Sequence, residues 1–241
     1  MAARLRLGCE ISNAPKKCNC KRKPVLDKLA THLLCCPLSG LIRRHDAIQS
    51  DILALAKSAG NQASVVCKDV LVLNTVGDNR RGDMILPQLG PGEKNVLGDF
   101  TITCPTASSY VEATRRDPES SIKRANDKKN TKYKDAAEAL DIKFMPLALE
   151  CYGAFSKDFL SLIHTLCEKR ATIAGTSKNN ITQYWFRRLS CTLQKGNARA
   201  ISKRILEITQ ATATLHDECF DDLNDEEYNN MDTTTNFRLE E

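Results

Sequence analysis

Three short runs of β-branched and apolar residues lie close together near the middle of the chain. Their sequences are SVVCKDVLVLN from Ser64, GDMILP from Gly82 and GDFTITCP from Gly98, and glycine, proline and asparagine separate them. Runs of this kind, bounded by turn-forming residues, are typical of strands that follow one another directly. The sequence therefore predicts a meander of three strands.

Helical patterns surround this meander. Before it, apolar side chains recur at helical spacing through residues 43–59, and Gly60 follows as a stop. After it come a charged, alanine-containing helix over residues 120–140 and a strand over residues 142–153, in which Pro146 favours an edge or a kink. Two further helices follow over residues 155–170 and 181–215. The order helix, three strands, helix, strand, helix predicts an α/β fold in which helices cover one mixed sheet.

The cysteines need an explanation other than disulfides. A chain of 241 residues buries enough core to be stable without them, yet it contains 11 cysteines. The sequence has no signal-peptide pattern at its N-terminus and no uncharged apolar stretch long enough to cross a bilayer. We therefore expect an intracellular protein with reduced thiols and no membrane partner.

Charge is distributed unevenly along the chain. The formal charge is +5, but the segment after residue 216 holds ten acidic residues against one arginine, Arg238, and so carries −9. Residues 1–216 therefore carry +14, and a basic body of this kind attracts phosphate backbones and releases their counterions. Solubilising lysines explain the charge equally well, so charge raises the nucleic-acid hypothesis without deciding it.

A cysteine-rich stretch precedes the first predicted helix. Cys18 and Cys20 form a short CNC turn, and in the HLLCC that follows, His32 and Cys36 share a face if the segment is helical. Zinc takes thiolate and imidazole ligands in a tetrahedron at about 2.0 to 2.3 Å. We expect these four residues to hold a structural zinc ion, because four protein ligands leave no position for water. Cys35 competes with Cys36 as a ligand, and burial of the cysteines in an ordinary core is the other interpretation.

Two acidic residues introduce the second and third predicted strands. Asp83 and Asp99 each follow a glycine at the start of their run, and neighbouring strands would bring them together. Two carboxylates so close repel each other unless they share a proton or bind a cation. Mg²⁺ prefers such oxygen ligands, polarises phosphate and lowers the pKa of a bound water for attack on phosphorus. The pair therefore predicts a magnesium site for phosphodiester hydrolysis.

A lysine-rich helix would complete such a site. Lys129 and Lys132 are three residues apart on the predicted helix 120–140, so they share a face, and either could reach the scissile phosphate. Glu150 closes the fourth predicted strand. Taken singly, the aspartates are also typical turn residues, the lysines a solvated helix face and Glu150 a helix cap. The order of the whole set along the chain favours a site.

Short motifs in a fixed order also carry a resemblance. CNC, HLLCC, RRHDAI, RRGDMIL, GDFTITCP, KKNTKY and FMPLALECYG span most of residues 4–172. This succession resembles the C-terminal region of non-LTR retrotransposon polyproteins, in which a CCHC zinc knuckle precedes a restriction-like endonuclease. That family has the PD-(D/E)XK nuclease fold and nicks target DNA with a divalent metal. The resemblance implies a reverse transcriptase-associated DNA endonuclease that uses Mg²⁺ or Mn²⁺, although this chain contains no polymerase motif.

The resemblance also implies roles for individual residues. Asp83 matches the first metal-binding aspartate of the family, and Asp99 matches the second. Lys129, Lys132 and Tyr133 match the lysine-tyrosine motif of the helix that follows these strands. Arg44 and His45 match the arginine-histidine pair that opens the first core helix, which is predicted over residues 43–59. Catalytic function is therefore expected at the acids and at the lysine-tyrosine motif, with Arg44, His45 and Glu150 as additional candidates.

Two positions depart from the family pattern. Gly82 stands where the family has proline, and Thr101 stands where the standard pattern has lysine, two residues after the second acid. The first change is mild, because only the acid binds metal. The second puts the catalytic lysine on the helix, where the restriction-like branch commonly supplies it, and leaves Lys129 and Lys132 as alternatives.

These observations divide the chain into four expected segments. Residues 1–40 are a segment with the CCHC zinc knuckle, and residues 41–172 are a restriction-endonuclease-like domain. Residues 173–216 are a C-terminal helical extension, and residues 217–241 are an acidic disordered tail. The expected partner is DNA, with element RNA or a reverse transcriptase beside it, in the nucleus. A catalytically inactive, zinc-containing DNA-binding module is the alternative function, and a protein-interaction fragment that uses the helices after residue 155 is a third.

Overall fold

The structure is a computed structural model that describes residues 8–11, 16–65 and 82–229, with the backbone alone described from residue 212 onward. Its helices are the two 3₁₀-helices η1 (Thr31–Leu34) and η2 (Pro37–Ser39) and the α-helices α2 (Ile42–Ser58), α3 (Val111–Arg116), α4 (Ser120–Glu138), α5 (Lys157–Ala174) and α6 (Lys178–Asn229). Its strands are β1 (Ser64–Val65), β2 (Met84–Leu86), β3 (Val96–Thr103) and β4 (Lys143–Glu150). No helix in the described part of the chain is both long and apolar enough to cross a membrane.

The four strands form one mixed sheet in the order β1-β2-β3-β4. β2 pairs antiparallel with both β1 and β3, whereas β4 runs parallel to β3 and forms an edge of the sheet. The predicted meander, the mixed sheet and the α/β class are therefore confirmed. The edge position accommodates Pro146, which has no N–H to donate to a further strand. Most of the first predicted run, residues 66–74, lies outside the described residues.

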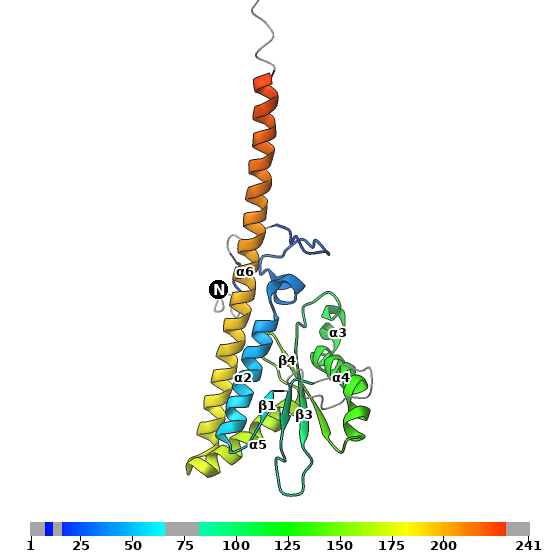
Figure 1. The fold of residues 1–241 in the computed structure, drawn as a ribbon, viewed down its shortest axis with the longest axis vertical. Coiled ribbons are helices and arrows are strands. Elements are labelled where there is room, and N and C mark those ends of the chain that lie inside the picture. The colour runs from blue at the N-terminus through cyan, green and yellow to red at the C-terminus, as the bar shows by residue number, and fades with distance from the viewer. Residues whose placement is uncertain (1–7, 12–15, 66–81, 230–241) are drawn as a thin grey trace, which may run out of the picture.

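Helices cover both faces of this sheet (Figure 1), and the alternation of side chains along the strands explains why. Met145, Leu147 and Leu149 of β4 lie in the main core with the apolar side chains of α2 and α5. Their neighbours in the strand face α4, where Ala148 packs against Ile122. Both faces of β4 are thus buried, which agrees with its nearly continuous apolar sequence.

Helix α6 is part of the core rather than an extension of it. Trp185, Leu189 and Leu193 are buried in the main core, because α6 packs along α2 and α5 (Figure 1). The prediction that residues 173–216 form an extension outside the domain is therefore wrong, because their side chains are part of its core. The prediction that most of this segment is helical is confirmed. The predicted disorder is wrong for residues 217–229, because α6 continues to Asn229. A helix already held by packing gains one hydrogen bond per residue added, and no glycine or proline interrupts it there.

The N-terminal segment packs on the same long helix. Ile201 and Ile208 of α6 are buried against Leu33 and Leu34 of η1, in a second core that also contains most of the cysteines. This core joins the predicted zinc knuckle to the α/β domain.

Candidate active site and candidate metal centre

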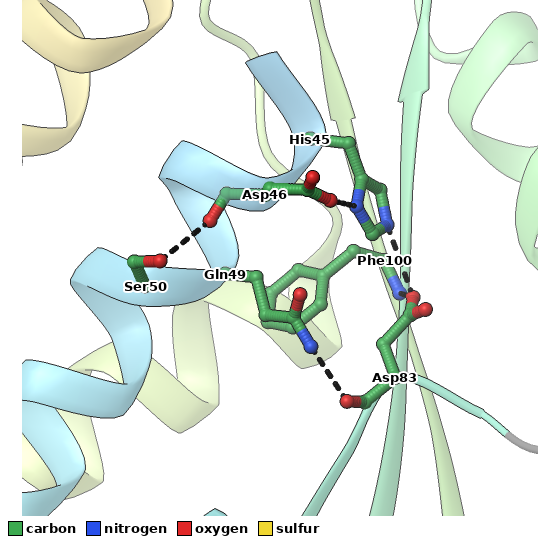
Figure 2. A network of polar contacts seen from close by, with 6 residues as sticks. All are labelled: His45, Asp46, Gln49, Ser50, Asp83 and Phe100. Atoms are coloured by element: carbon green, nitrogen blue, oxygen red, sulfur yellow. Dashed lines mark hydrogen bonds and ion pairs between the residues drawn. The ribbon is translucent and has the colours of Figure 1, made fainter. Parts of the chain in front are cut away.

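Asp83 lies directly before β2, at the end of the strand pairing between β2 and β3. β2 pairs with β3 only as far as Gly98, so the backbone N–H of Phe100 has no strand partner on that side. The N–H of Phe100 donates instead to Oδ2 of Asp83 at 2.6 Å. From α2, Gln49 donates its side-chain N–H to the backbone carbonyl of Asp83 at 2.6 Å. Both the carboxylate and the backbone of Asp83 are thus fixed by the scaffold (Figure 2).

The residue before Asp83 has to be glycine in this structure. Gly82 has φ of +64°, a left-handed conformation, and a Cβ there would lie 2.8 Å from the Leu97 side chain. Proline fixes φ near −65° and cannot adopt this conformation. The departure from the family pattern at Gly82 is therefore a property of the turn that leads into Asp83.

His45 joins α2 to Asp83. Its Nε2 lies 3.1 Å from Oδ2 of Asp83, its Nδ1 lies 3.1 Å from Oδ1 of Asp46, and its ring meets Phe100 edge to face (Figure 2). The hydrogen bond to Asp83 raises the pKa of His45 to about 9, although burial opposes this. The imidazole is therefore protonated at neutral pH and balances the charge of the Asp83 carboxylate.

Asp99 is the buried member of the acidic pair. It is 3% exposed on β3, where it faces α4, and its carboxylate forms an ion pair with Lys129. Burial raises the pKa of Asp99 and the charge of Asp83 raises it further, whereas Lys129 and a hydrogen bond from Tyr133 lower it. The ring of Tyr133 stacks on Phe144 with centroids 5.1 Å apart. Tyr133 therefore positions the acid from within the core between α4 and the sheet.

A basic cleft opens above these acids. Its volume is about 600 Å³, and it lies between the start of α2, the middle of β3 and α4. His45, Asp83, Thr101, Lys128, Lys129 and Lys132 are among its lining residues. Lys132 Nζ lies 4.7 Å from the centroid of the Tyr133 ring, whereas Lys129 contacts Asp99 directly. Asp83 and both candidate lysines thus line one cleft, and the buried Asp99 is connected to it through Lys129.

Glu150 lies elsewhere. Asp99 pairs with Pro146 in the parallel register, so Glu150 is four residues further along β4, or about 13 Å at 3.3 Å per residue. Its carboxylate accepts a hydrogen bond of 2.5 Å from Ser121 and lines a different cavity. The structure therefore does not bring Glu150, an additional candidate, together with Asp83 and Asp99, because the parallel register sets it apart from them.

Arg44 also points away from the acids. Its guanidinium donates to Oδ1 of Asn197 at 2.6 Å and to the carbonyl of Leu34 at 3.2 Å. Only part of the side chain lines the cleft, and the residue is 3% exposed. Of the arginine-histidine pair that opens α2, the histidine faces the acids, whereas the arginine ties α2 to α6 and η1.

The predicted metal ligands come together near the N-terminus. One ligand atom from each of Cys18, Cys20, His32 and Cys36 lies within 4.8 Å of the other three. Sγ of Cys18 is 3.8 Å from Sγ of Cys36, and Sγ of Cys20 is 3.4 Å from Nε2 of His32. At Zn–S distances of about 2.3 Å, a tetrahedron places two sulfurs about 3.8 Å apart. The donor set and its spacing are therefore compatible with a zinc site.

The local structure differs from the helical turn expected to bring His32 and Cys36 together. η1 ends at Leu34, and Cys36 is extended, with φ of −66° and ψ of 128°, because Pro37 follows it. Cys35 donates to the His32 carbonyl and is not in the group, so Cys36 is the cysteine of this pair that joins the other three donors. Burial lowers the pKa of His32, and the neutral imidazole is the form that binds metal.

Arg204 of α6 stands beside this group. Its guanidinium is 3.8 Å from Sγ of Cys18, is hydrogen-bonded to Asn19, and forms an ion pair of 2.7 Å with Glu207. Three thiolates around Zn²⁺ leave a net charge of −1, which a buried guanidinium offsets. The position of Arg204 is thus suited to a charged metal centre.

Sequence reasoning missed Gln49 and Arg204. Gln49 follows His45 by four residues and so lies on the same face of α2, a signal that the helical pattern contained. Arg204 had no such signal, because it is 186 positions after Cys18 and only the fold brings them together.

No protein-family model matches this sequence, and no curated protein matches it.

Proposed function

We propose that this chain is a metal-dependent DNA endonuclease with the PD-(D/E)XK architecture, of the kind found in non-LTR retrotransposons. The observation that carries the proposal is the contact of Lys129 with the buried Asp99, close to Asp83 in one basic cleft. The order α2, β1, β2, β3, α3, α4, β4, with Asp83 directly before β2 and Asp99 within β3, supports the same architecture.

The acidic pair fits a divalent cation. Burial and the charge of Asp83 both raise the pKa of Asp99, and a hard cation relieves the repulsion between the two carboxylates. Bound between them, Mg²⁺ or Mn²⁺ would polarise a phosphate oxygen and lower the pKa of a water molecule. The zinc-compatible group has four protein ligands and serves a structural role, so hydrolysis is assigned to the cleft.

The protein side chains have separate roles in this proposal. Lys129 lowers the pKa of the buried Asp99, which favours its ionised form, and offers its ammonium to the negative charge that develops on the phosphate. His45, Gln49 and the N–H of Phe100 hold Asp83 in one orientation. Lys128 and Lys132, further along the cleft, attract the neighbouring phosphates.

DNA is the proposed substrate because the body of the chain is basic. Residues 1–216 carry +14, and the cleft is lined by three lysines of α4. A retrotransposon origin further suggests a nuclear location and element RNA or a reverse transcriptase as partners.

The decisive experiment is nicking of supercoiled plasmid by the purified protein. We expect relaxed and linear products with Mg²⁺ or Mn²⁺, and none when EDTA is added together with the metal. Asp83→Asn serves as the matched control, because it removes a charge and keeps the size of the side chain. Cleavage by this variant at the parent rate would assign the activity to a contaminant.

One observation favours an inactive, zinc-containing DNA-binding module as a second candidate. Thr101 occupies the position of the standard catalytic lysine, and its Oγ1 is buried without a hydrogen-bond partner among the described residues. In that case the protein binds DNA with and without added metal and never cuts it.

A further inference from the structure

A second basic cavity lies on the other side of α2. It is a groove of about 700 Å³ between α2 and α6, which pack side by side (Figure 1). The helices run antiparallel, because Arg44 near the start of α2 contacts Asn197, whereas Asp51, further along, contacts Arg188. We call this cavity the α2–α6 groove.

Small residues form its floor. Gly196 allows the close approach of the two helices, since a Cβ there would lie 2.6 Å from Cγ of Arg44. Further small residues line the groove, at Gly40, Ala47, Ser50, Ala200 and Ser202. The groove is therefore open to a chain that approaches closely.

Cations line its walls. Arg43 of α2 and Lys195, Arg199 and Lys203 of α6 are solvent-exposed and line the groove. The three cations of α6 are spaced four residues apart, so they lie on one face at intervals of about 6 Å. A row of regularly spaced cations suits a polymer with regularly spaced charges better than a single small anion.

The only acid of the groove is already neutralised. Asp51 accepts hydrogen bonds from Arg188 at 2.7 Å and from Thr192 at 2.6 Å. Among the described residues, no carboxylate pairs with Arg43, Lys195 or Arg199. The groove therefore presents a net positive charge to any ligand.

Arg44 connects the groove to the cleft. It lines both cavities, is 3% exposed, and no carboxylate of the described residues pairs with its guanidinium. Its Nε has no hydrogen-bond partner in the described part of the chain. A buried cation without a counter-charge is costly, and an anionic ligand on either side would offset that cost.

We propose that the α2–α6 groove binds the phosphate backbone of duplex DNA adjacent to the site of cleavage. The choice of DNA as the ligand rests on the proposed function. The observation of a basic groove lined by small residues does not depend on that function. Arg43, Arg44 and His45 are consecutive on α2, and the first faces the groove, the second separates the two cavities and the third faces the acids. A backbone that leaves the cleft passes the start of α2 and enters the groove.

The test is DNA affinity, measured by fluorescence anisotropy with a labelled duplex and no added Mg²⁺. EDTA is omitted because it would also remove zinc. We expect Lys195→Ala/Arg199→Ala to raise Kd about tenfold and to reduce the slope of log K against log salt by about 1.8, which is two contacts at about 0.9 each. Lys94→Ala/Lys143→Ala is the control, because these lysines line a separate cavity near the start of β4.

A second variant tests the groove by adding charge instead of removing it. Ser202 is exposed on the groove, so Ser202→Glu should also weaken binding while the melting temperature stays at the parent value. Parent-like affinity in both groove variants would overturn the proposal, as would an equal loss in the lysine control. Preference of the groove for an RNA duplex of the same sequence would overturn the choice of DNA. Groove-dependent binding by a parent that never cleaves would support the groove and reject the nuclease.

Discussion

Nε2 of His45 lies 3.1 Å from Oδ2 of Asp83, and this contact joins the first core helix to the acid at the start of β2. Both side chains are mostly buried, and the hydrogen bond raises the pKa of His45 to about 9. The imidazole of His45 therefore holds its proton at neutral pH. This contact links the stability of the cation-free protein to the same residues that we propose for cleavage.

A first prediction separates the charge of Asp83 from its hydrogen bonds. Asp83→Asn should abolish metal-dependent nicking and retain an oxygen that accepts from the Phe100 N–H. Asp83→Ala should abolish nicking as well, and also lower the free energy of unfolding by about 1–3 kcal/mol, because that N–H loses its acceptor. Urea denaturation of both variants measures the difference. Equal stability of the two variants would contradict the role assigned to Oδ2.

A second prediction concerns pH. The folded pKa of His45 is about 9 and the unfolded value is near 6.5, so the folded state holds a proton that the unfolded state has lost between these values. The contribution of protonated His45 to the free energy of unfolding is fully present below about pH 6.5. It is lost as the pH rises to about 9, by at most about 1.4 kcal/mol per pH unit. Urea midpoints at several pH values, without added Mg²⁺, should show this slope. His45→Gln should flatten it.

A third prediction distinguishes the two lysines of the cleft. Lys129→Ala should slow nicking at neutral pH by about 10²-fold, because it removes the cation that contacts Asp99. Without Lys129 the pKa of the buried Asp99 rises, so part of the lost rate should return at higher pH. Lys132→Ala should have a smaller effect with no such pH dependence. The pH profile of nicking rates checks both, and the opposite ranking would assign the role to Lys132.

A fourth prediction concerns the cysteine-histidine group. Elemental analysis should find zinc in protein purified without chelator. Cys36→Ser should lose the zinc and Cys35→Ser should retain it, because Cys36 belongs to the four-ligand group and Cys35 contacts a backbone carbonyl. The two adjacent cysteines are matched controls for each other. Zinc loss from the Cys35 variant alone would reverse the assignment.

A fifth prediction concerns the turn before Asp83. Gly82→Pro restores the residue of the family pattern but cannot adopt φ of +64°. We expect it to lower the free energy of unfolding by more than about 1 kcal/mol and to impair nicking. Gly92→Pro, at another left-handed glycine in a loop, is a control for the backbone effect alone. It should reduce stability without a specific loss of activity.

The sequence predicted the fold well where the patterns were long. Apolar spacing over residues 43–59 and 155–170 matches α2 and α5, because a helix buried on one face repeats its apolar residues every three or four positions. The short helix α3 was missed, since six residues with no buried side chain leave no such pattern. The turn at Cys36 was mispredicted because the effect of Pro37 on the preceding residue outweighed the helical spacing.

The candidate site was predictable only in part. The order of acids and lysines indicated Asp83, Asp99 and Lys129, because adjacent strands and the helix after them have to pack together. Glu150 could not be excluded from sequence, since nothing in the chain fixes the parallel register that displaces it from Asp99. Contacts between distant segments, such as Arg204 with Cys18, follow from the fold alone.

The straight course of α6 keeps opposite charges apart. An α-helix rises about 1.5 Å per residue, so the acidic stretch that begins at Asp217 starts about 20 Å beyond Lys203, the last cation of the α2–α6 groove. At physiological ionic strength the screening length is about 8 Å, so this gap exceeds two screening lengths. The helix therefore acts as a spacer that gives one polypeptide two electrostatically independent ends. If the α2–α6 groove binds a polyanion as proposed, the acidic sequence that begins at Asp217 starts beyond the screening range of that contact.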